Sequence, residues 1–352
     1  MKPLVSILIP AYNAEAWVAE TIRSALAQTW PRKEIIVVDD GSNDRTAEVA
    51  RQFTSKEVFV VSTKNQGAAA ARNHAFQLSQ GDYIQWLDAD DLLAPDKIER
   101  QLEVVRGTDG KRLLISSSWG YFYYRTHRAR FIRTSLWQDL SAVDWLLRNV
   151  GANVFMPTLN WLMSRDLADA VGPWDTRLLS DDDAEYFCRV LITSNGARFA
   201  PDARAFYRIT PASRLSYIRP SDDRKKDAKI LSMKLHIQYL RSLEESDRVR
   251  KACLAYLQIW FDTFYPERPD LVAELQNLAA ELRSRLEVPH LRWKYDWMVP
   301  IFGWKAAKWA QMTLPQIRAS QARRWDKFMY KLETRNAAGD HWANLVQASQ
   351  GN

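Results

Sequence analysis

The sequence predicts an α/β protein with a mostly parallel β-sheet flanked by helices, followed by an all-α extension at the C-terminus. In the first hundred residues, β-branched apolar runs alternate with stretches of helical periodicity, which is typical of βαβ units. After residue 218 only helical periodicity is found. The net charge of +7 lies entirely there, with 23 Lys and Arg against 16 Asp and Glu. We therefore expect one unit at 1–218 and a basic, Trp-rich helical unit at 219–352.

Four apolar strands are expected in the first unit, and a polar loop follows each of them. The strands are residues 4–9, 34–38, 57–61 and 83–87, with Pro10 ending the first. An Ala-rich helix is expected at 68–78, and Pro95 suits the first position of a later helix. Because ligands gather at the carboxyl ends of parallel strands, the loops at 10–13, 39–40, 64–67 and 88–91 should share one edge.

Three carboxylates, Asp88, Asp90 and Asp91, follow the fourth strand within four positions. Carboxylates crowded at the end of a buried strand repel one another and lose solvation. A hard divalent cation with oxygen ligands, Mg²⁺ or Mn²⁺, would offset that cost when it is shared with a phosphate. A solvated turn is the alternative. Because the first loop has no glycine-rich phosphate cradle, an anionic donor would be held by the metal and by Lys64 or Arg72.

Four segments in the same order resemble the family 2 glycosyltransferases of the GT-A fold. They are VSILIPAYN at 5–13, VVDDGSNDRT at 37–46, NQGAAAARN at 65–73 and LDADD at 87–91. The resemblance extends more weakly to about residue 216. It implies an inverting transfer of a sugar from a nucleoside-diphosphate sugar, with UDP the expected nucleotide, to an acceptor hydroxyl. Polysaccharide, cell-envelope glycan or glycolipid synthesis would be the setting, with a glycan or lipid-linked acceptor.

The resemblance also implies roles for residues of the donor site. Asp40 would read the base, and Arg72 would lie near the diphosphate unless it is merely an exposed helix residue. Asp90 would be nearest the metal and Asp88, the second ligand, nearer the ribose. The other residues expected to contact the donor are Pro10, Ala11, Tyr12, Asn13, Lys64, Gly67 and Ala89.

A second acidic run supplies the candidate base. Members of the family have a Glu-Asp pair seven and six residues before an arginine, and counting back from Arg189 gives Asp182 and Asp183. The resemblance thus makes Asp183 the catalytic base, with Asp182 in place of the Glu. Because Asp181 precedes them, an assignment shifted by one residue stays open, and so does simple capping of a helix by acidic residues.

The resemblance leaves the third metal ligand open, because Thr210 stands where the family often has a histidine. Arg208 or Arg214 would then be candidates to face the diphosphate. We expect residues 1–106 to form the nucleotide-binding half of the catalytic unit and residues 107–218 the acceptor half. The acceptor half should contain short strands at residues 112–117, 119–125, 129–134 and 159–163.

The tail reads as helices at 226–243, 248–264 and 270–286, with two more beyond residue 290. Three tryptophans, Trp293, Trp297 and Trp304, have lysines nearby and allow two interpretations. They pack the tail onto the catalytic unit, or they anchor it reversibly to an anionic membrane. A nucleic-acid role is disfavoured because no recognised binding motif accompanies the basic residues.

With no secretory pattern, no long apolar run and two isolated cysteines, we expect a cytoplasmic protein, peripheral to the membrane if the tail binds it. Two other functions remain as alternatives. A metal-dependent sugar-phosphate nucleotidyltransferase would need a glycine-rich, lysine-bearing loop after the first strand, which residues 10–13 are not. A non-catalytic sugar-nucleotide-binding protein would not need the carboxylates at Asp88, Asp90, Asp182 and Asp183.

Overall fold

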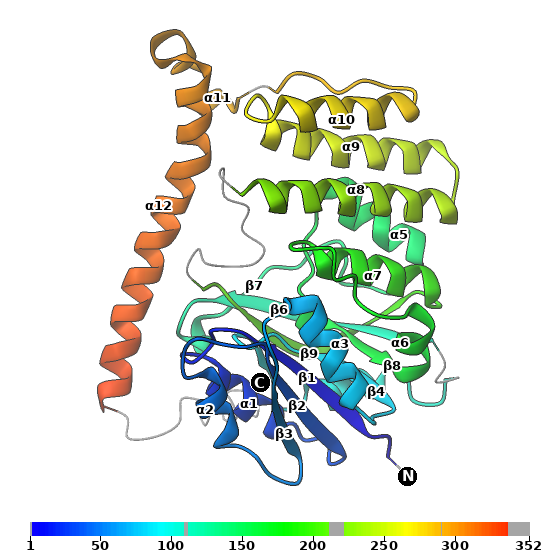
Figure 1. Ribbon diagram of the computed structural model, residues 1–352, viewed down its shortest axis with the longest axis vertical. Coiled ribbons are helices and arrows are strands. Elements are labelled where there is room, and N and C mark those ends of the chain that lie inside the picture. Colours follow the sequence, from blue (N-terminus) through cyan, green and yellow to red (C-terminus); the bar gives the residue numbers. More distant parts are fainter. Residues whose placement is uncertain (1, 109–111, 211–221, 290, 337–352) are drawn as a thin grey trace.

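A computed structural model describes residues 2–108, 112–210, 222–289 and 291–336. Its centre is one nine-stranded sheet with the order β3-β2-β1-β4-β8-β6-β9-β5, and β7 pairs with β6 (Figure 1). The strands are β1 Val5–Ala11, β2 Lys33–Asp39, β3 Val58–Ser62, β4 Tyr83–Trp86, β5 Leu92–Leu93, β6 Leu114–Phe122, β7 Arg130–Phe131, β8 Leu162–Ser164 and β9 Ala197–Arg208. Strands β1 to β4 are mutually parallel, as predicted, whereas β8 runs antiparallel to β4.

Helices cover both faces of the sheet and then continue away from it. They are α1 Val18–Leu26, α2 Thr46–Arg51, α3 Ala68–Leu78, α4 Lys97–Glu103, α5 Ala142–Leu146, α6 Arg165–Val171, α7 Asp182–Thr193, α8 Asp223–Leu243, α9 Asp247–Phe264, α10 Pro269–Glu281, α11 Trp293–Asp296 and α12 Val299–Asn336. Short 3₁₀ or π turns occupy Thr126–Arg128, Leu147–Gly151 and Thr158–Asn160. The predicted fold class, an α/β unit with a helical C-terminal region, is confirmed.

Three local predictions were wrong for identifiable reasons. Strand β1 continues through Pro10, because the missing N–H of Pro10 faces β4, and β4 has already ended opposite Leu8. Helix α4 begins at Lys97 rather than Pro95, since β5 pairs with β9 and holds the preceding residues in the sheet. The two strands predicted at 112–117 and 119–125 are one strand, β6, with a register shift after Ser117.

The period-two alternation of the strands divides the core into two clusters. Leu8 and Ile36 point to the cluster under α3, α6 and α7, and Ile7 and Ile35 point to the opposite cluster, which contains α1 and α4. Apolar side chains of α8, α9 and α10 belong to the first cluster, and Figure 1 shows these helices stacked in successive layers beyond α7. The helical extension and the sheet therefore share one core. The predicted boundary near residue 218 lies outside the described residues.

A buried ion pair joins α8 to the residue before α7. Lys229 of α8 donates to Asp181 Oδ2 over 2.6 Å, and Ser232 donates to the same oxygen. The ammonium of Lys229 also lies 4.2 Å from the ring centroid of Trp260 on α9. Although burial opposes the ionisation of Asp181, Lys229 lowers the pKa of this carboxyl below its usual value. The start of α7 is thus fixed by the C-terminal helices.

Substituting Lys229→Met should destabilise the protein by about 1–3 kcal/mol, because the largely buried carboxylate of Asp181 loses the ammonium group that donates to it. The matched control is Lys234→Met on the same helix. In the wild-type protein Lys234 forms an exposed ion pair with Glu274. We expect that control to cost less than about 1 kcal/mol. Urea unfolding of both variants is the measurement, and equal midpoints would contradict the structural role of Lys229.

Candidate active site

The loops after β1 and β2 are tied together at the carboxyl edge of the sheet. Asp40 N donates to Ala11 O over 2.8 Å, Asn13 N donates to Ser42 Oγ over 2.9 Å, and Asn43 N donates to Asn13 Oδ1 over 2.8 Å. Asn13 has a left-handed backbone conformation, with φ of 49°, and it takes part in two of these hydrogen bonds. The ring of Tyr12, which follows Pro10 and Ala11, stands exposed above the two loops.

Asp40 is buried and fixed by the next loop along the sheet edge. Its carboxylate accepts from Gln66 N over 2.9 Å and from Gly67 N over 2.8 Å. Gly67 supplies the positive φ of 96° from which α3 begins. A cavity of about 230 Å³ lies between this loop and α3. Of the residues predicted to contact the nucleotide-sugar donor, Asp40 alone lines this cavity. Its lining is Asp40, Thr63, Gln66, Ala70, Ala71, Asn73, His74, Gln77 and Thr176.

Arg72 connects the two acidic runs that are far apart in the sequence. It donates to Asp88 over 2.8 Å and to Asp182 over 2.6 Å, and its guanidinium lies 4.4 Å from the ring centroid of Trp174. The side chain is buried, so the alternative of an exposed helix residue is wrong. Burial opposes the charge of Arg72, but Asp182 and Asp88 outweigh it and raise its pKa. One cation therefore links the end of β4 to the start of α7.

Asp183 carries a carboxyl whose pKa suits a general base. Burial, followed by the negative charges of Asp182 and Asp181, raises the pKa of Asp183 to about 7, although Arg72 acts in the opposite direction. Its Oδ1 accepts only the N–H of the next residue, Ala184, among the hydrogen bonds found in the described residues. A base is most effective when its pKa is near the working pH.

The three aspartates after β4 have different environments. The side chain of Asp88 is 33% exposed and bonded to Arg72, Asp90 is half-buried, and Asp91 is buried. Asp91 Oδ1 accepts from Arg208 N over 2.7 Å, while Asp91 Oδ2 is buried without a partner among the described residues. Burial, with Asp90 and Asp88, raises the pKa of Asp91. A cation beside these carboxylates would relieve that cost.

The carboxylate oxygens of Asp88 and Asp90 are the kind of ligand that a hard divalent cation prefers, and Asp88 Oδ1 already accepts a hydrogen bond from Arg72. The described part of the chain contains no group of three or more His, Cys, Asp or Glu side chains arranged around a single point. A cation at Asp88 and Asp90 would therefore need ligands from the bound donor or water. Ala89 between them is buried, and its carbonyl accepts from Thr21 Oγ1 over 2.9 Å. Lys64 is exposed after β3.

Arg208 supports the Asp90 segment from inside the protein. Its Nε donates to Asp90 O over 2.7 Å, and its Nη2 donates to Glu20 over 2.5 Å. The guanidinium lies 4.5 Å from the ring centroids of both Trp17 and Phe122. We infer that Arg208 positions the backbone of Asp90, instead of facing a diphosphate as the sequence suggested. Arg214, the other candidate, lies outside the described residues.

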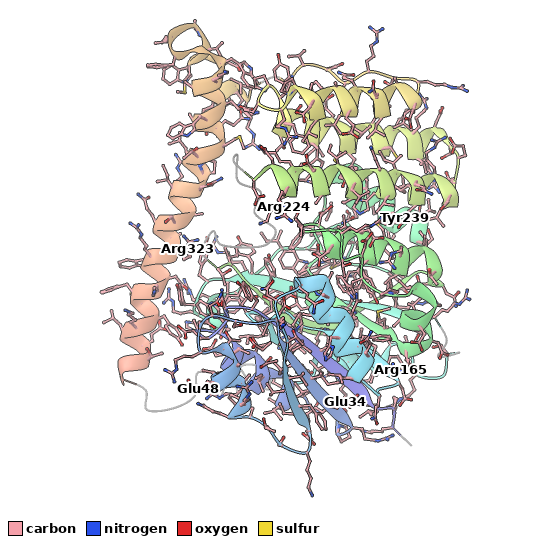
Figure 2. The ribbon with its side chains drawn as sticks, viewed as in Figure 1. Glu34, Glu48, Arg165, Arg224, Tyr239 and Arg323 are labelled. Atoms are coloured by element: carbon pink, nitrogen blue, oxygen red, sulfur yellow. The ribbon has the colours of Figure 1, made fainter. Side chains whose placement is uncertain are left out.

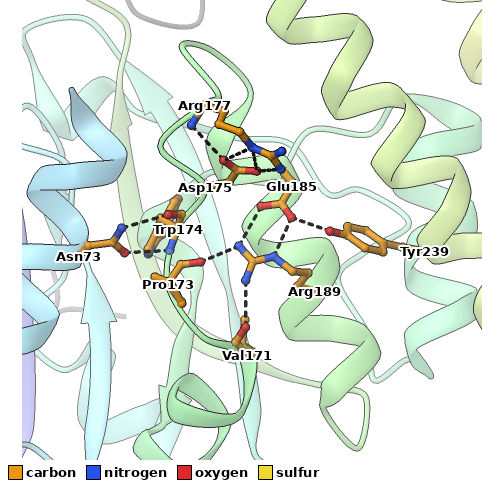
Figure 3. Close-up of polar contacts among 9 residues, drawn as sticks. All are labelled: Asn73, Val171, Pro173, Trp174, Asp175, Arg177, Glu185, Arg189 and Tyr239. Atoms are coloured by element: carbon orange, nitrogen blue, oxygen red, sulfur yellow. Dashed lines mark hydrogen bonds and ion pairs between the residues drawn. The ribbon is translucent and has the colours of Figure 1, made fainter. Parts of the chain in front are cut away.

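Arg189, the residue from which the base was counted, holds α7 in place (Figure 3). It donates to the carbonyls of Val171 and Pro173 over 2.9 Å each and pairs with Glu185. Glu185 also accepts from Tyr239 of α8 over 2.8 Å. The same loop is fixed from the other side because Asn73 exchanges two hydrogen bonds with the backbone of Trp174 (Figure 3). Trp174 in turn stacks on Arg72.

Three contributors to this arrangement were missed by sequence reasoning. Lys229 fixes Asp181, Trp174 covers Arg72, and Glu20 holds Arg208. No local sequence pattern marks these three residues, because their partners lie between 48 and 188 positions away in the chain. The excess of tryptophan, 15 in all, was the one available signal, and it did not distinguish Trp174.

The pKa of Asp183 predicts how stability depends on pH. Below about pH 7 the folded protein keeps a proton on Asp183 that the unfolded chain releases near pH 4, so this contribution to stability is lost as the pH rises through 7. Asp183→Asn should remove the loss and make the variant more stable than wild type at pH 8, by on the order of 2 kcal/mol, with a smaller difference at pH 5. Thermal unfolding at the two pH values is the measurement. A difference independent of pH would contradict the raised pKa.

Comparisons with known proteins show which family part of the chain resembles. Residues 6–170 match the model of the family described as glycosyl transferase family 2. The chain is 37% identical over 132 residues to an uncharacterized glycosyltransferase of Rickettsia typhi, covering 38% of this chain and 41% of that protein. It is 44% identical over 105 residues to TuaG of Bacillus subtilis, a putative teichuronic acid biosynthesis glycosyltransferase, covering 29% of this chain and 42% of TuaG. The chain thus spans about two fifths of these relatives' lengths.

The fold also matches a solved structure. S. aureus TarS, residues 1–349, in complex with UDP superposes with a TM-score of 0.56 and 15% sequence identity, covering 80% of this chain and 86% of the TarS chain. At that identity the likeness establishes the fold alone. Residues 6–170, which are just under half of the chain, therefore match glycosyl transferase family 2, and the fold is the GT-A fold seen in TarS.

Proposed function

We propose that the protein transfers a sugar from a UDP-sugar to an acceptor hydroxyl with inversion at the anomeric carbon. The observation that carries the proposal is the Arg72 bridge, which brings Asp88 of the expected donor site next to Asp182 and the base candidate Asp183. TarS, which shares the fold, has been solved with UDP and with UDP-GlcNAc. TuaG is named for the biosynthesis of a polysaccharide, teichuronic acid. A cell-envelope polysaccharide or a glycolipid is therefore the proposed product.

In the proposed reaction Asp183 accepts the proton of the acceptor hydroxyl while the oxygen of that hydroxyl attacks the anomeric carbon. The bond between that carbon and the diphosphate oxygen breaks, and the electron pair leaves with UDP from the opposite face of the sugar. Arg72 pairs with Asp182 next to the candidate base, and Asp40 lies at the end of the sheet expected to hold the uracil. A divalent cation held by Asp88 and Asp90 would supply positive charge to the leaving diphosphate.

The structure also bears on the alternatives. A nucleotidyltransferase releases pyrophosphate from a nucleoside triphosphate, and it would use a lysine-bearing cradle after β1. Here that loop instead exchanges hydrogen bonds with Ser42 and Asn43. A non-catalytic binding protein would not need the Arg72 bridge that brings Asp88 next to Asp182 and Asp183. Both observations favour sugar transfer.

Asp183→Asn should lower transfer by about 10²–10⁴-fold, because the acceptor hydroxyl loses its base. UDP affinity should change little, since the base acts on the acceptor. The measurement is UDP release from a panel of UDP-sugars with glycan and lipid acceptors, together with calorimetric UDP binding. Asp169→Asn, an exposed carboxylate on α6, is the matched control and should keep full activity.

Other outcomes of that experiment are equally informative. If Asp182→Asn is the more damaging change, the base assignment is shifted by one residue. If neither variant loses activity, Asp183 is not the base. Release of pyrophosphate from UTP and a sugar phosphate, without UDP release from any UDP-sugar, would overturn the proposed function in favour of nucleotidyl transfer.

Donor binding should depend on a divalent cation. In wild type, chelation should weaken calorimetric UDP affinity by at least about tenfold, because the carboxylates at Asp88 and Asp90 would otherwise repel the diphosphate. Asp90→Ala should bind UDP with the same affinity whether or not Mn²⁺ is present. Asp202→Ala, an exposed carboxylate in β9, should retain the wild-type dependence. Equal wild-type affinity with Mn²⁺ and after chelation would contradict the metal role.

A further inference from the structure

Helix α12 carries a row of exposed apolar side chains that no other described element covers. Figure 1 shows α12 along one side of the molecule, and Figure 2 shows its side chains projecting away from the sheet. The row, which we call the α12 stripe, consists of Leu314, Ile317, Trp325, Phe328 and Leu332. Spacings of three, four and eight residues place them on one face of the helix. At 1.5 Å per residue the stripe is about 27 Å long.

The helix is fixed to the enzyme by its other faces. Near its beginning, Lys308 pairs with Glu267 over 2.8 Å, and the ring of Trp304 packs edge-on against Tyr265. Near its end, Arg125 pairs with Asp326 over 2.7 Å and with Glu333 over 2.8 Å. These contacts hold α12 in one orientation, with the stripe directed outward.

The charges of α12 select the kind of surface that the stripe fits. Between residues 299 and 336 the sequence has eight basic residues and two acidic ones, Asp326 and Glu333. Both acidic residues pair with Arg125 on the side facing the enzyme. The outer side is therefore positive. The exposed basic residues at helical positions beside the stripe are Arg318, Arg324 and Lys331, whereas Lys327 lies 5.6 Å from the ring centroid of Tyr124 on the enzyme side.

We propose that the α12 stripe and its flanking basic residues bind the surface of an anionic membrane. Apolar side chains of an amphipathic helix enter the boundary between headgroups and acyl chains, while the basic residues attract anionic lipid. A second copy of this chain is a poorer occupant, because two stripes packed together would bring Arg318, Arg324 and Lys331 of both copies close to one another. None of the helices in the described ranges has the length and apolar content needed to cross a bilayer.

The proposal relocates the membrane contact that the sequence suggested at 297–304. Trp293 and Trp297 are exposed and extend the surface at the start of α12, so the packing interpretation is wrong for them. Trp304 instead packs against Tyr265, as that interpretation requires. Gly303, with φ of 79° and ψ of 163°, interrupts the helix between the two groups. The main surface is therefore the later part of α12.

The same helix contacts the support of the candidate active site. Tyr330 donates to Glu20 over 3.3 Å, Glu20 accepts from Arg208, and Arg208 donates to Asp90 O. Membrane binding through the α12 stripe would thus place the donor site close to the lipid surface. This consequence, a membrane-borne acceptor, rests on the proposed function, whereas the membrane contact itself does not.

Vesicle co-sedimentation of the full chain tests the proposal without using activity. The probes are phosphatidylcholine vesicles with and without about 30% phosphatidylglycerol, at low and high salt. Wild type should bind the anionic vesicles at low salt and dissociate at 1 M salt, where screening shortens to about 3 Å. The variant Trp325→Ser/Phe328→Ser/Leu332→Ser should bind at least about tenfold more weakly. The variant Arg318→Gln/Arg324→Gln/Lys331→Gln should lose about 100-fold, and with it the preference for anionic lipid.

The control replaces three exposed apolar residues outside α12, as Phe59→Ser/Leu78→Ser/Ile132→Ser, and should bind like wild type. Thermal unfolding of each variant verifies that it is folded. The proposal is overturned if wild type does not bind anionic vesicles at low salt, if the stripe variant binds as wild type does, or if neutral vesicles bind equally well. A dimer in analytical ultracentrifugation that only the stripe variant abolishes, without vesicle binding, would identify a second copy as the occupant.

Discussion

The interaction on which the site depends is the pair of hydrogen-bonded ion pairs from Arg72 to Asp88 and Asp182. Without a cation between them, carboxylates from the end of β4 and from the start of α7 would repel one another in a poorly solvated place. Arg72 is itself buried, and Trp174 covers its guanidinium. One side chain therefore links the carboxylates of the expected donor site to the candidate base Asp183, and its charge also acts on that carboxyl.

The second constraint is the attachment of α7, whose first turn carries Asp182 and Asp183. Lys229 and Ser232 of α8 hold Asp181, and Tyr239 of α8 binds the Glu185 carboxylate that pairs with Arg189. The helices after residue 222 thus help to position the candidate base. The hydrophobic core also holds these helices against the sheet. Apolar side chains of α8 to α10 belong to the cluster that contains Trp86 of β4 and Phe187 of α7.

Helix α12 differs from these helices in what it contacts. It meets the rest of the protein through a few polar and aromatic contacts near its ends, and it leaves an apolar face outside. Burying apolar surface is favourable, so a helix of this kind is expected to meet another surface. Its position beside Glu20 and Arg208 joins that surface to the candidate active site.

The strands β1 to β4, the helix α3 and the loops at the carboxyl edge of the sheet could be predicted from sequence, because strand and helix periodicities are local and parallel strands align their ends. The resemblance to a known family also indicated Asp40, Asp88, Asp90 and Asp183 as candidate site residues. Three contacts became visible only in the folded chain: Arg72 is buried between Asp88 and Asp182, Arg208 donates to the backbone of Asp90, and Lys229 fixes Asp181. The reason is physical: these are long-range contacts between buried charges, and the energy of a buried charge depends on partners that chain folding, not local sequence, brings together.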